Sequence, residues 1–160
     1  MQTVDIKQHT FRLNKQKIRE YVFHKNTSEE QRMAKDTCIL IVDDFPIMRG
    51  IIRRMLTKRF NLNNIIEADD GAAAWDILNK GKVDMIICDW NMPNMTGIAL
   101  LKKIRADKRF AHLPFVMVTA EGKKENVIEA TKAGVTGFIV KPFTAKDLGK
   151  KLSLILQDEE

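Results

Sequence analysis

Five short apolar segments alternate along the chain with five segments of helical pattern, and this alternation restricts the possible folds most. Continuous β-branched and apolar runs of this kind are typical of strands that are buried on both faces. Strands that alternate with helices form a parallel sheet covered by helices on both sides. We therefore predict an α/β fold with a doubly wound, five-stranded parallel sheet flanked by five helices. The expected strands are CILIV (38–42), NIIEA (64–68), VDMIICD (83–89), LPFVMVTA (113–120) and GFIV (137–140).

The helical segments carry start and stop residues of the usual kinds. Pro46 suits the first turn of the first helix, and Thr96 is suited to cap the N-terminus of the third. Gly81 and Gly134 are expected to end the second and fourth helices. The expected helices are PIMRGIIRRMLTKRF (46–60), GAAAWDILNKG (71–81), TGIALLKKIRAD (96–107), KKENVIEATKAG (123–134) and TAKDLGKKLSLIL (144–156).

The N-terminal part of the chain lacks this regular pattern. Residues 1–35 are polar and weakly periodic, and HKNTSEEQR reads as an exposed linker. We expect an N-terminal extension over residues 1–35, either helical or disordered, and a single compact domain over residues 36–160. Because a chain that began at Met33 would still encode that domain, an over-long gene start remains an alternative.

Composition and charge exclude several classes of protein. No apolar run approaches the roughly 20 residues of a membrane span, and MQTVDIKQHT has no signal-peptide core. The net charge is +6, but residues 1–32 hold seven Lys/Arg and four Asp/Glu, half of that excess, without any nucleic-acid-binding motif. Cys38 and Cys88 lie in apolar runs and indicate buried thiols in a reducing compartment. We expect a cytoplasmic protein that binds neither nucleic acid nor membrane.

Polar residues follow the apolar runs at the carboxyl ends of four expected strands. They are Asp43 and Asp44, Asp89, Thr119 and Lys141. In open parallel sheets, ligands bind outside the carboxyl ends of the strands, so these side chains are expected to converge. An isolated Asp in such a place is usually a turn residue or a helix cap. The conjunction of all five residues on the proper strands is far more specific.

Three neighbouring carboxylates repel one another, because one like-charge pair at 4 Å costs roughly 4 kcal/mol at moderate effective dielectric. Such a cluster persists when it binds protons or a cation. Hard oxygen ligands favour Mg²⁺, which takes one or two carboxylates together with phosphate oxygens. The ammonium of Lys141 and the hydroxyl of Thr119 supply the other half of a phosphate site. We infer that Asp89 faces a metal ion and attacks a phosphoryl group.

The motifs VDD, CDWNMPNMTG, MVTAEGKKEN and VKPFTA resemble those of response-regulator receiver domains, especially of the chemotaxis regulator CheY. The resemblance covers about residues 36–157. It implies a flavodoxin-like, CheY-like fold with strand order 2-1-3-4-5. It also implies a cis peptide bond between Lys141 and Pro142.

The resemblance also implies a role for each matching residue. Asp89 matches the phosphoacceptor, and Asp43 and Asp44 match the acidic pair that holds Mg²⁺ together with Asp89 and the backbone carbonyl of Asn91. Thr119 and Lys141 complete the catalytic set, in which the hydroxyl and the ammonium reach phosphoryl oxygens. The residues implied to surround the phosphoryl group are Trp90, Asn91, Thr119, Ala120 and Lys141.

An output surface is implied around the fourth helix, the fifth strand and the fifth helix. Its switch aromatic falls at Phe138, where CheY proteins commonly have Tyr, so this chain lacks the hydroxyl that could bond a partner. Lys123, Lys124 and Lys151 lie on the same expected surface, although on sequence alone such lysines are most often just solvated.

The expected function is that of a stand-alone, monomeric CheY-type response regulator. It would receive a phosphoryl group from a CheA-like histidine kinase and dock onto a FliM-like flagellar motor switch protein, with a phosphatase as a further partner. The alternative is a single-domain phosphorelay shuttle or phosphate sink without a motor partner. An aspartate-nucleophile phosphohydrolase would want a second Asp two residues after the nucleophile, where this chain has Asn91. We therefore expect no enzyme beyond self-catalysed phosphorylation and dephosphorylation.

Overall fold

The computed structural model describes residues 36–157 and confirms the predicted alternation of strands and helices. The expected extension over residues 1–35 lies outside the described residues. The strands are β1 (Ile39–Val42), β2 (Ile65–Ala68), β3 (Met85–Asp89), β4 (Phe115–Thr119) and β5 (Gly137–Val140). The helices are α3 (Pro46–Phe60), α4 (Gly71–Lys80), α5 (Gly97–Ala106), α6 (Lys124–Lys132) and α7 (Ala145–Gln157).

The five strands form one sheet in the order β2-β1-β3-β4-β5, and every neighbouring pair is parallel. This confirms both the fold class and the strand order implied by the resemblance. The register aligns Val42 with Cys88, Cys88 with Met117, and Met117 with Phe138. The carboxyl ends of the central strands therefore reach the same edge of the sheet.

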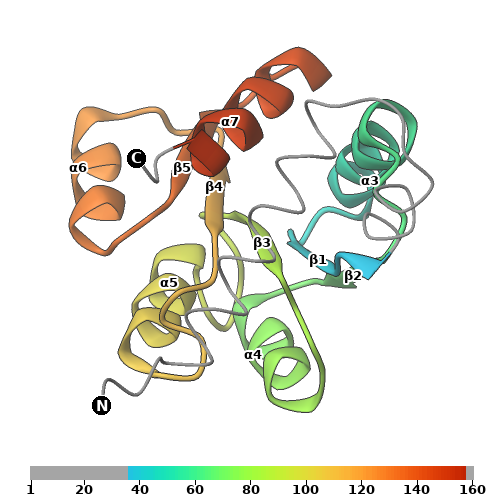
Figure 1. Cartoon of the computed structure of the whole chain (residues 1–160). Coiled ribbons are helices and arrows are strands. Elements are labelled where there is room, and N and C mark those ends of the chain that lie inside the picture. Colours follow the sequence, from blue (N-terminus) through green and yellow to red (C-terminus); the bar gives the residue numbers. More distant parts are fainter. Residues whose placement is uncertain (1–35, 158–160) are drawn as a thin grey trace, which may run out of the picture.

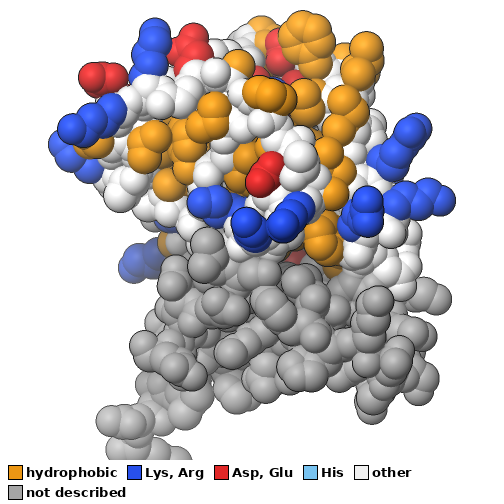
Figure 2. Space-filling view, turned by 90° about the horizontal axis from the view of Figure 1, so that it is seen from above, with side chains coloured by type: hydrophobic (Ala, Val, Ile, Leu, Met, Phe, Trp, Pro, Cys, Tyr) orange, Lys and Arg blue, Asp and Glu red, His pale blue; other side chains and the backbone are white. Residues whose placement is uncertain are grey.

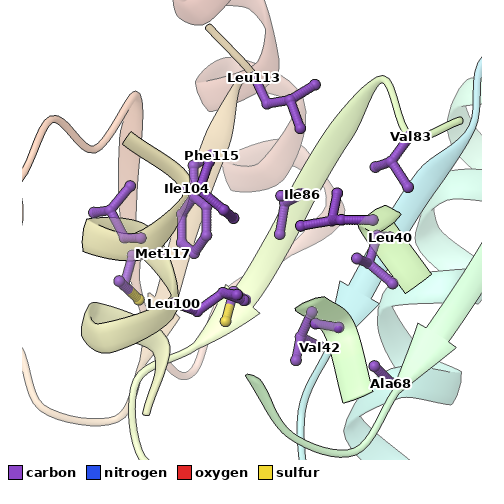
Figure 3. Packing of buried hydrophobic residues seen from close by; sticks show 14 of the residues in the cluster. Leu40, Val42, Ala68, Val83, Ile86, Leu100, Ile104, Leu113, Phe115 and Met117 are labelled. Atoms are coloured by element: carbon purple, nitrogen blue, oxygen red, sulfur yellow. The ribbon is translucent and has the colours of Figure 1, made fainter. Parts of the chain in front are cut away.

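Alternate strand residues point into two separate cores, because successive side chains of a strand lie on opposite faces. Leu40, Ile86 and Phe115 belong to the core under α4, α5 and α6, which Figure 3 shows at close range. Ile39 and Ile87 belong to the other core, under α3 and α7. Figure 1 shows these two helix layers on either side of the sheet. Burial on both faces explains why the strands read as continuous apolar runs.

The helix ends follow the predicted signals with one difference. Pro46 begins α3, and the side chain of Thr96 accepts a hydrogen bond from the backbone N–H of Ala99 at the start of α5. Gly134 follows α6 with φ +86°, which favours glycine, whereas Gly81 ends α4 in an extended conformation. Within residues 36–157, no helix combines the length and the apolar character that crossing a membrane requires.

Candidate functional site

Three carboxylates meet at the carboxyl edge of the sheet, as the sequence predicts. Val42 on β1 and Cys88 on β3 are register partners, and each is directly followed by an acid, Asp43 and Asp89 respectively. Asp43 is 1% exposed and Asp89 is 8% exposed. One carboxylate oxygen from each of Asp43, Asp44 and Asp89 lies within 4.8 Å of the other two. Two of the three acids are therefore held in buried positions, Asp89 as the last residue of β3 and Asp43 directly after β1.

The ammonium group of Lys141 lies between the two buried acids. Its Nζ donates to Asp43 Oδ2 at 3.0 Å and to Asp89 Oδ1 at 3.2 Å, and the side chain is 17% exposed. Lys141 directly follows β5, and its peptide bond to Pro142 is cis, as expected from the resemblance. Its backbone N–H donates to the carbonyl of Thr119 at 2.7 Å. Lys141 is thus held by hydrogen bonds of both its backbone N–H and its side-chain ammonium.

Burial and the neighbouring charges shift the pKa values of Asp89 and Lys141. Burial raises the pKa of the Asp89 carboxyl, and the charge of Asp43 raises it further, although Lys141 acts in the opposite direction. Burial acts to lower the pKa of Lys141, but its hydrogen bond to Asp43 and the charge of Asp89 outweigh this, so the net pKa is raised. Lys141 therefore stays positively charged near neutral pH, and its charge offsets part of the cost of ionising the buried Asp89 carboxyl.

The donor set of the cluster fits a small, hard divalent cation. Mg²⁺ binds oxygen ligands at about 2.0–2.1 Å in octahedral geometry, so ligands on opposite sides lie about 4.2 Å apart. Adjacent ligands lie about 2.9 Å apart, so the three acids, whose oxygens lie within 4.8 Å of one another, would draw closer together around a shared ion. A cation there would also relieve the repulsion among them. The acidic triad can therefore bind a divalent metal ion.

The other residues predicted for the phosphate site lie around this cluster. Thr119, the last residue of β4, is fully buried, and its hydroxyl accepts a hydrogen bond from the backbone N–H of Glu121 at 3.1 Å. Trp90 follows Asp89 and is buried, whereas Asn91 and Ala120 are exposed. These residues are neighbours of the acids in sequence and strand order, and their roles remain predictions.

The predicted switch residue contacts the site through an aromatic pair. Phe138 on β5 is half-buried, and its ring meets Trp90 edge to face with centroids 6.5 Å apart. Phe138 and Lys151 also line a groove of about 430 Å³ between β5 and α7. Lys123 and Lys124 are exposed at the start of α6. A contact path therefore leads from the residue beside Asp89 to the outer surface.

Sequence reasoning missed two residues that support the acids. Arg49 on α3 donates through Nη1 to the backbone carbonyl of Asp43 at 2.6 Å and through Nε to Glu67 at 2.9 Å. A Cβ on Gly97 would overlap the backbone carbonyl of Asp89, so the first residue of α5 must be glycine for the helix to approach β3. In the sequence, the only sign of this role was that Gly97 follows the capping residue Thr96.

Comparison with known proteins decides the family. The sequence profile of the response regulator receiver domain matches residues 39–153, which is most of the chain. The chain belongs to the response regulator receiver family. Membership makes it a CheY-like signalling protein and not a classical enzyme, and the acidic pocket lies where receiver domains are expected to carry theirs.

Individual receiver proteins agree with this assignment. The chain is 52% identical over 128 residues to chemotaxis protein CheY-3 of Vibrio cholerae, which covers 80% of this chain and 98% of that protein. It is 52% identical over 119 residues to chemotaxis protein CheY of Pseudomonas aeruginosa, covering 74% and 95% respectively. The solved structure of chemotaxis response regulator CheY4 of Vibrio cholerae has a TM-score of 0.68 and 33% identity, covering 74% of this chain and 98% of that one.

Proposed function

We propose that this receiver domain is a chemotaxis phospho-switch that accepts a phosphoryl group on Asp89 in the presence of Mg²⁺. The observation that carries the proposal is the pairing of Asp89 with one ammonium and two further acids. Lys141 Nζ lies 3.2 Å from Asp89, and oxygens of Asp43 and Asp44 lie within 4.8 Å of an Asp89 oxygen. Asp43, Asp44, Asp89 and the backbone carbonyl of Asn91 would hold the ion.

The proposed reaction is transfer from a phosphorylated histidine of a kinase. A carboxylate oxygen of Asp89 forms a bond to phosphorus while the bond between phosphorus and the histidine nitrogen breaks, and the imidazole leaves. Phosphoryl transfer depends mainly on positioning and on neutralising charge, and Mg²⁺ when bound supplies part of that neutralisation. Lys141 supplies another part, because its ammonium already faces the attacking carboxylate. The buried strand end supplies the positioning.

The signal would leave the site through Thr119 and Phe138. The acyl phosphate carries about −1.5 to −2 charges at neutral pH by analogy with other phospho-residues, and its new acceptor oxygens attract a hydroxyl donor. Thr119 is the register partner of Val140 on β5, and the preceding residue, Val118, is the partner of Ile139. Movement at Thr119 therefore acts directly on β5. The ring of Phe138 already contacts Trp90 beside the acceptor. Phe138 then changes the outer surface by packing alone, because it has no hydroxyl.

The proposed partner surface is formed by α6, β5 and α7. Its groove is lined mostly by apolar and basic side chains, among them Phe143, Lys150 and Lys151, and by one acidic residue, Asp147. Figure 2, which looks down on the side of the molecule that carries α7, shows apolar side chains exposed among Lys and Arg. Such a surface suits a partner segment with apolar and acidic residues. Because both curated relatives are chemotaxis proteins, we propose a flagellar motor switch protein as that partner.

The remaining partners follow from the same relatives. We propose a CheA-like histidine kinase as phosphodonor, a phosphatase that ends the signal, and a monomer as the working state. We place the protein in the cytoplasm, which agrees with the two free, buried cysteines of the described part. We further propose that the receiver occupies residues 36–160, and the family match over residues 39–153 supports this.

Labelling with acetyl phosphate tests the proposal. The wild-type protein should take up one phosphoryl group per chain with Mg²⁺ and none with EDTA, and Asp89→Asn should take up none. Asp76→Asn is the matched control, because Asp76 is an exposed residue of α4 outside the cluster. Full labelling of Asp89→Asn would show that another residue is the acceptor.

A pull-down with and without the phosphate mimic beryllofluoride tests the partner. Mimic-dependent recovery of a motor switch protein supports the chemotaxis role. Recovery of a histidine phosphotransfer domain in its place would show a relay shuttle, and equal recovery with and without the mimic would contradict a phospho-switch.

A further inference from the structure

The loop between β3 and α5 connects the proposed acceptor to the first residue of a helix. It runs from Trp90 to Thr96 and includes Asn91, whose carbonyl we propose as a metal ligand. The backbone N–H of Gly97 donates to the carbonyl of Trp90 at 2.9 Å, which closes the base of the loop. Met92 is buried beneath it, whereas Asn91, Pro93 and Asn94 are exposed. The upper part of the loop therefore needs support from outside itself.

That support comes from the residues at the start of α4. Asn94 Nδ2 donates to Asp70 Oδ2 at 2.5 Å, and Asp70 Oδ1 accepts from the backbone N–H of Ala73 at 2.8 Å. Asp70 thus caps α4 with one oxygen and holds Asn94 with the other. We call the Asp70–Asn94 hydrogen bond, which joins the two loops, the latch.

A second contact lies beside the latch. The backbone N–H of Gly71 donates to the carbonyl of Met95 at 3.2 Å. A Cβ on Gly71 would lie 2.8 Å from both Cγ and the carbonyl oxygen of Met95, so only glycine permits this approach. The start of α4 is therefore shaped to receive the loop, in both its side chain and its backbone.

The conformation and charge of the latch residues suit this task. Asn94 has φ +62°, a left-handed conformation that asparagine tolerates better than most residues. The hydrogen bond from Ala73 lowers the pKa of Asp70, and the hydrogen bond from Asn94 lowers it further. Asp70 is therefore ionised near neutral pH, where a charged acceptor makes the hydrogen bond stronger.

We propose that Asp70 and Asn94 are positioning residues for the metal site, because their latch holds the Asn91 carbonyl in the place from which it can bind Mg²⁺. Only Asn91, Met92 and Pro93 lie between the buried Trp90 and the latch. With the latch intact, this short stretch is fixed at both ends. Without it, the loop must be ordered when the ion binds, which weakens the apparent affinity. The inference rests on the proposed function, since it assumes that the acidic triad binds Mg²⁺.

Isothermal titration of the full chain with Mg²⁺ tests this role, using variants that break the latch and little else. Asn94→Gly removes the amide and keeps a residue suited to positive φ. Asp70→Ser keeps an N-cap for α4 but is too short to hold Asn94. We expect each to weaken Mg²⁺ binding about tenfold, as loss of outer-shell partners does at other metal sites.

Two further variants control the test. The exchange Asp70→Asn with Asn94→Asp restores a carboxylate–amide pair and should return the dissociation constant to within about twofold of wild type. Asn61→Gly is the matched control, because Asn61 also has positive φ, at 51°, but ends α3 away from the loop. It should leave Mg²⁺ affinity unchanged.

The outcomes separate the two proposals. Loss of affinity in both latch variants, with recovery in the exchanged pair, supports the positioning role. Wild-type affinity in Asn94→Gly and Asp70→Ser, or no recovery in the exchanged pair, overturns it while the metal site itself stands. A wild-type chain that binds no Mg²⁺ overturns the proposed function.

Discussion

Replacing Lys141 with methionine isolates the charge that holds the cluster together. Methionine keeps a long, flexible apolar stem and removes the ammonium group. In the wild type this group lies 3.0 Å from Asp43 Oδ2 and 3.2 Å from Asp89 Oδ1, and both acids are buried. The substitution leaves two buried carboxylates facing each other without their cation. It therefore tests whether the positive charge of Lys141 stabilises the two buried carboxylates or merely lies near them.

The size of the effect follows from these distances. Each attraction is worth about 5 kcal/mol before desolvation, at an effective dielectric of about 20. Removing one partner of a buried ion pair costs about 3–5 kcal/mol. We expect the lower end, about 3 kcal/mol, because the lysine side chain is 17% exposed and Asp89 can take up a proton. For a domain of this size, that lowers Tm by about 10 °C.

Urea unfolding in EDTA measures the loss, and unfolding in excess Mg²⁺ measures how far a metal ion replaces the amine. Because the ammonium competes with the ion for the same oxygens, Lys141→Met should bind Mg²⁺ about tenfold more tightly, a change of about 1.4 kcal/mol. Lys102→Met is the matched control. Its 2.8 Å bridge to Glu129 is shorter but exposed, and its loss should cost less than about 1 kcal/mol.

Two results would contradict a stabilising role for the Lys141 ammonium. If Lys141→Met unfolds in EDTA like the wild type, the buried ion pairs contribute nothing to stability. If it binds Mg²⁺ more weakly, the amine and the ion do not compete, and the account of the site's charge is wrong.

Three further predictions follow from the same geometry. Mg²⁺ at ten times its dissociation constant should stabilise the wild type by about 1.4 kcal/mol, and a melting temperature that stays constant across millimolar Mg²⁺ would contradict this. In urea unfolding with EDTA, Asp89→Asn should be more stable than the wild type at pH 7 and should show no gain near pH 3. The reason is that the raised pKa of Asp89 makes its ionised form costly in the folded state. The free energy of unfolding of the wild type therefore falls as pH rises from the ordinary carboxyl pKa to the raised one. In thermal unfolding, Gly97→Ala should lower the free energy of unfolding by about 2–3 kcal/mol, because its Cβ meets the Asp89 carbonyl. Gly50→Ala, inside α3 with nothing within 4 Å of the new Cβ, should raise it by about 0.5–1 kcal/mol. Equal effects of the two substitutions would argue against the close packing of α5 on β3.

The fold could be predicted because its signals are local and repeated. Strands such as Ile39–Val42 and Phe115–Thr119 are buried on both faces, so every residue in them is apolar or small, and α5 begins at a capping threonine of a known kind. The meeting of Asp43 and Asp89 was also predictable, because parallel strands end at one edge. Lys141 was also expected at this edge, but its exact place between both acids depends on how the chain turns after β5, which no spacing reveals.

Contacts between loops could not be predicted in this way. Asp70 and Asn94 are 24 residues apart in different loops, and neither belongs to a periodic pattern. Arg49 reads as one more basic residue on the outer face of a helix, although it donates to the carbonyl of Asp43. The edge-to-face contact depends on the side-chain conformations of Trp90, directly after β3, and of Phe138 on β5. Such contacts arise from three-dimensional packing and need coordinates.

Chemical mapping of the phosphorylated residue identifies the side chain that accepts the phosphoryl group. The protein is incubated with acetyl phosphate and Mg²⁺, the acyl phosphate is reduced with borohydride, and peptides are sequenced by mass spectrometry. We expect that Asp89 alone is converted to homoserine and that EDTA abolishes the conversion. Conversion at Asp43 or Asp44, or conversion of Asp89 at the same rate without a divalent ion, would contradict this expectation.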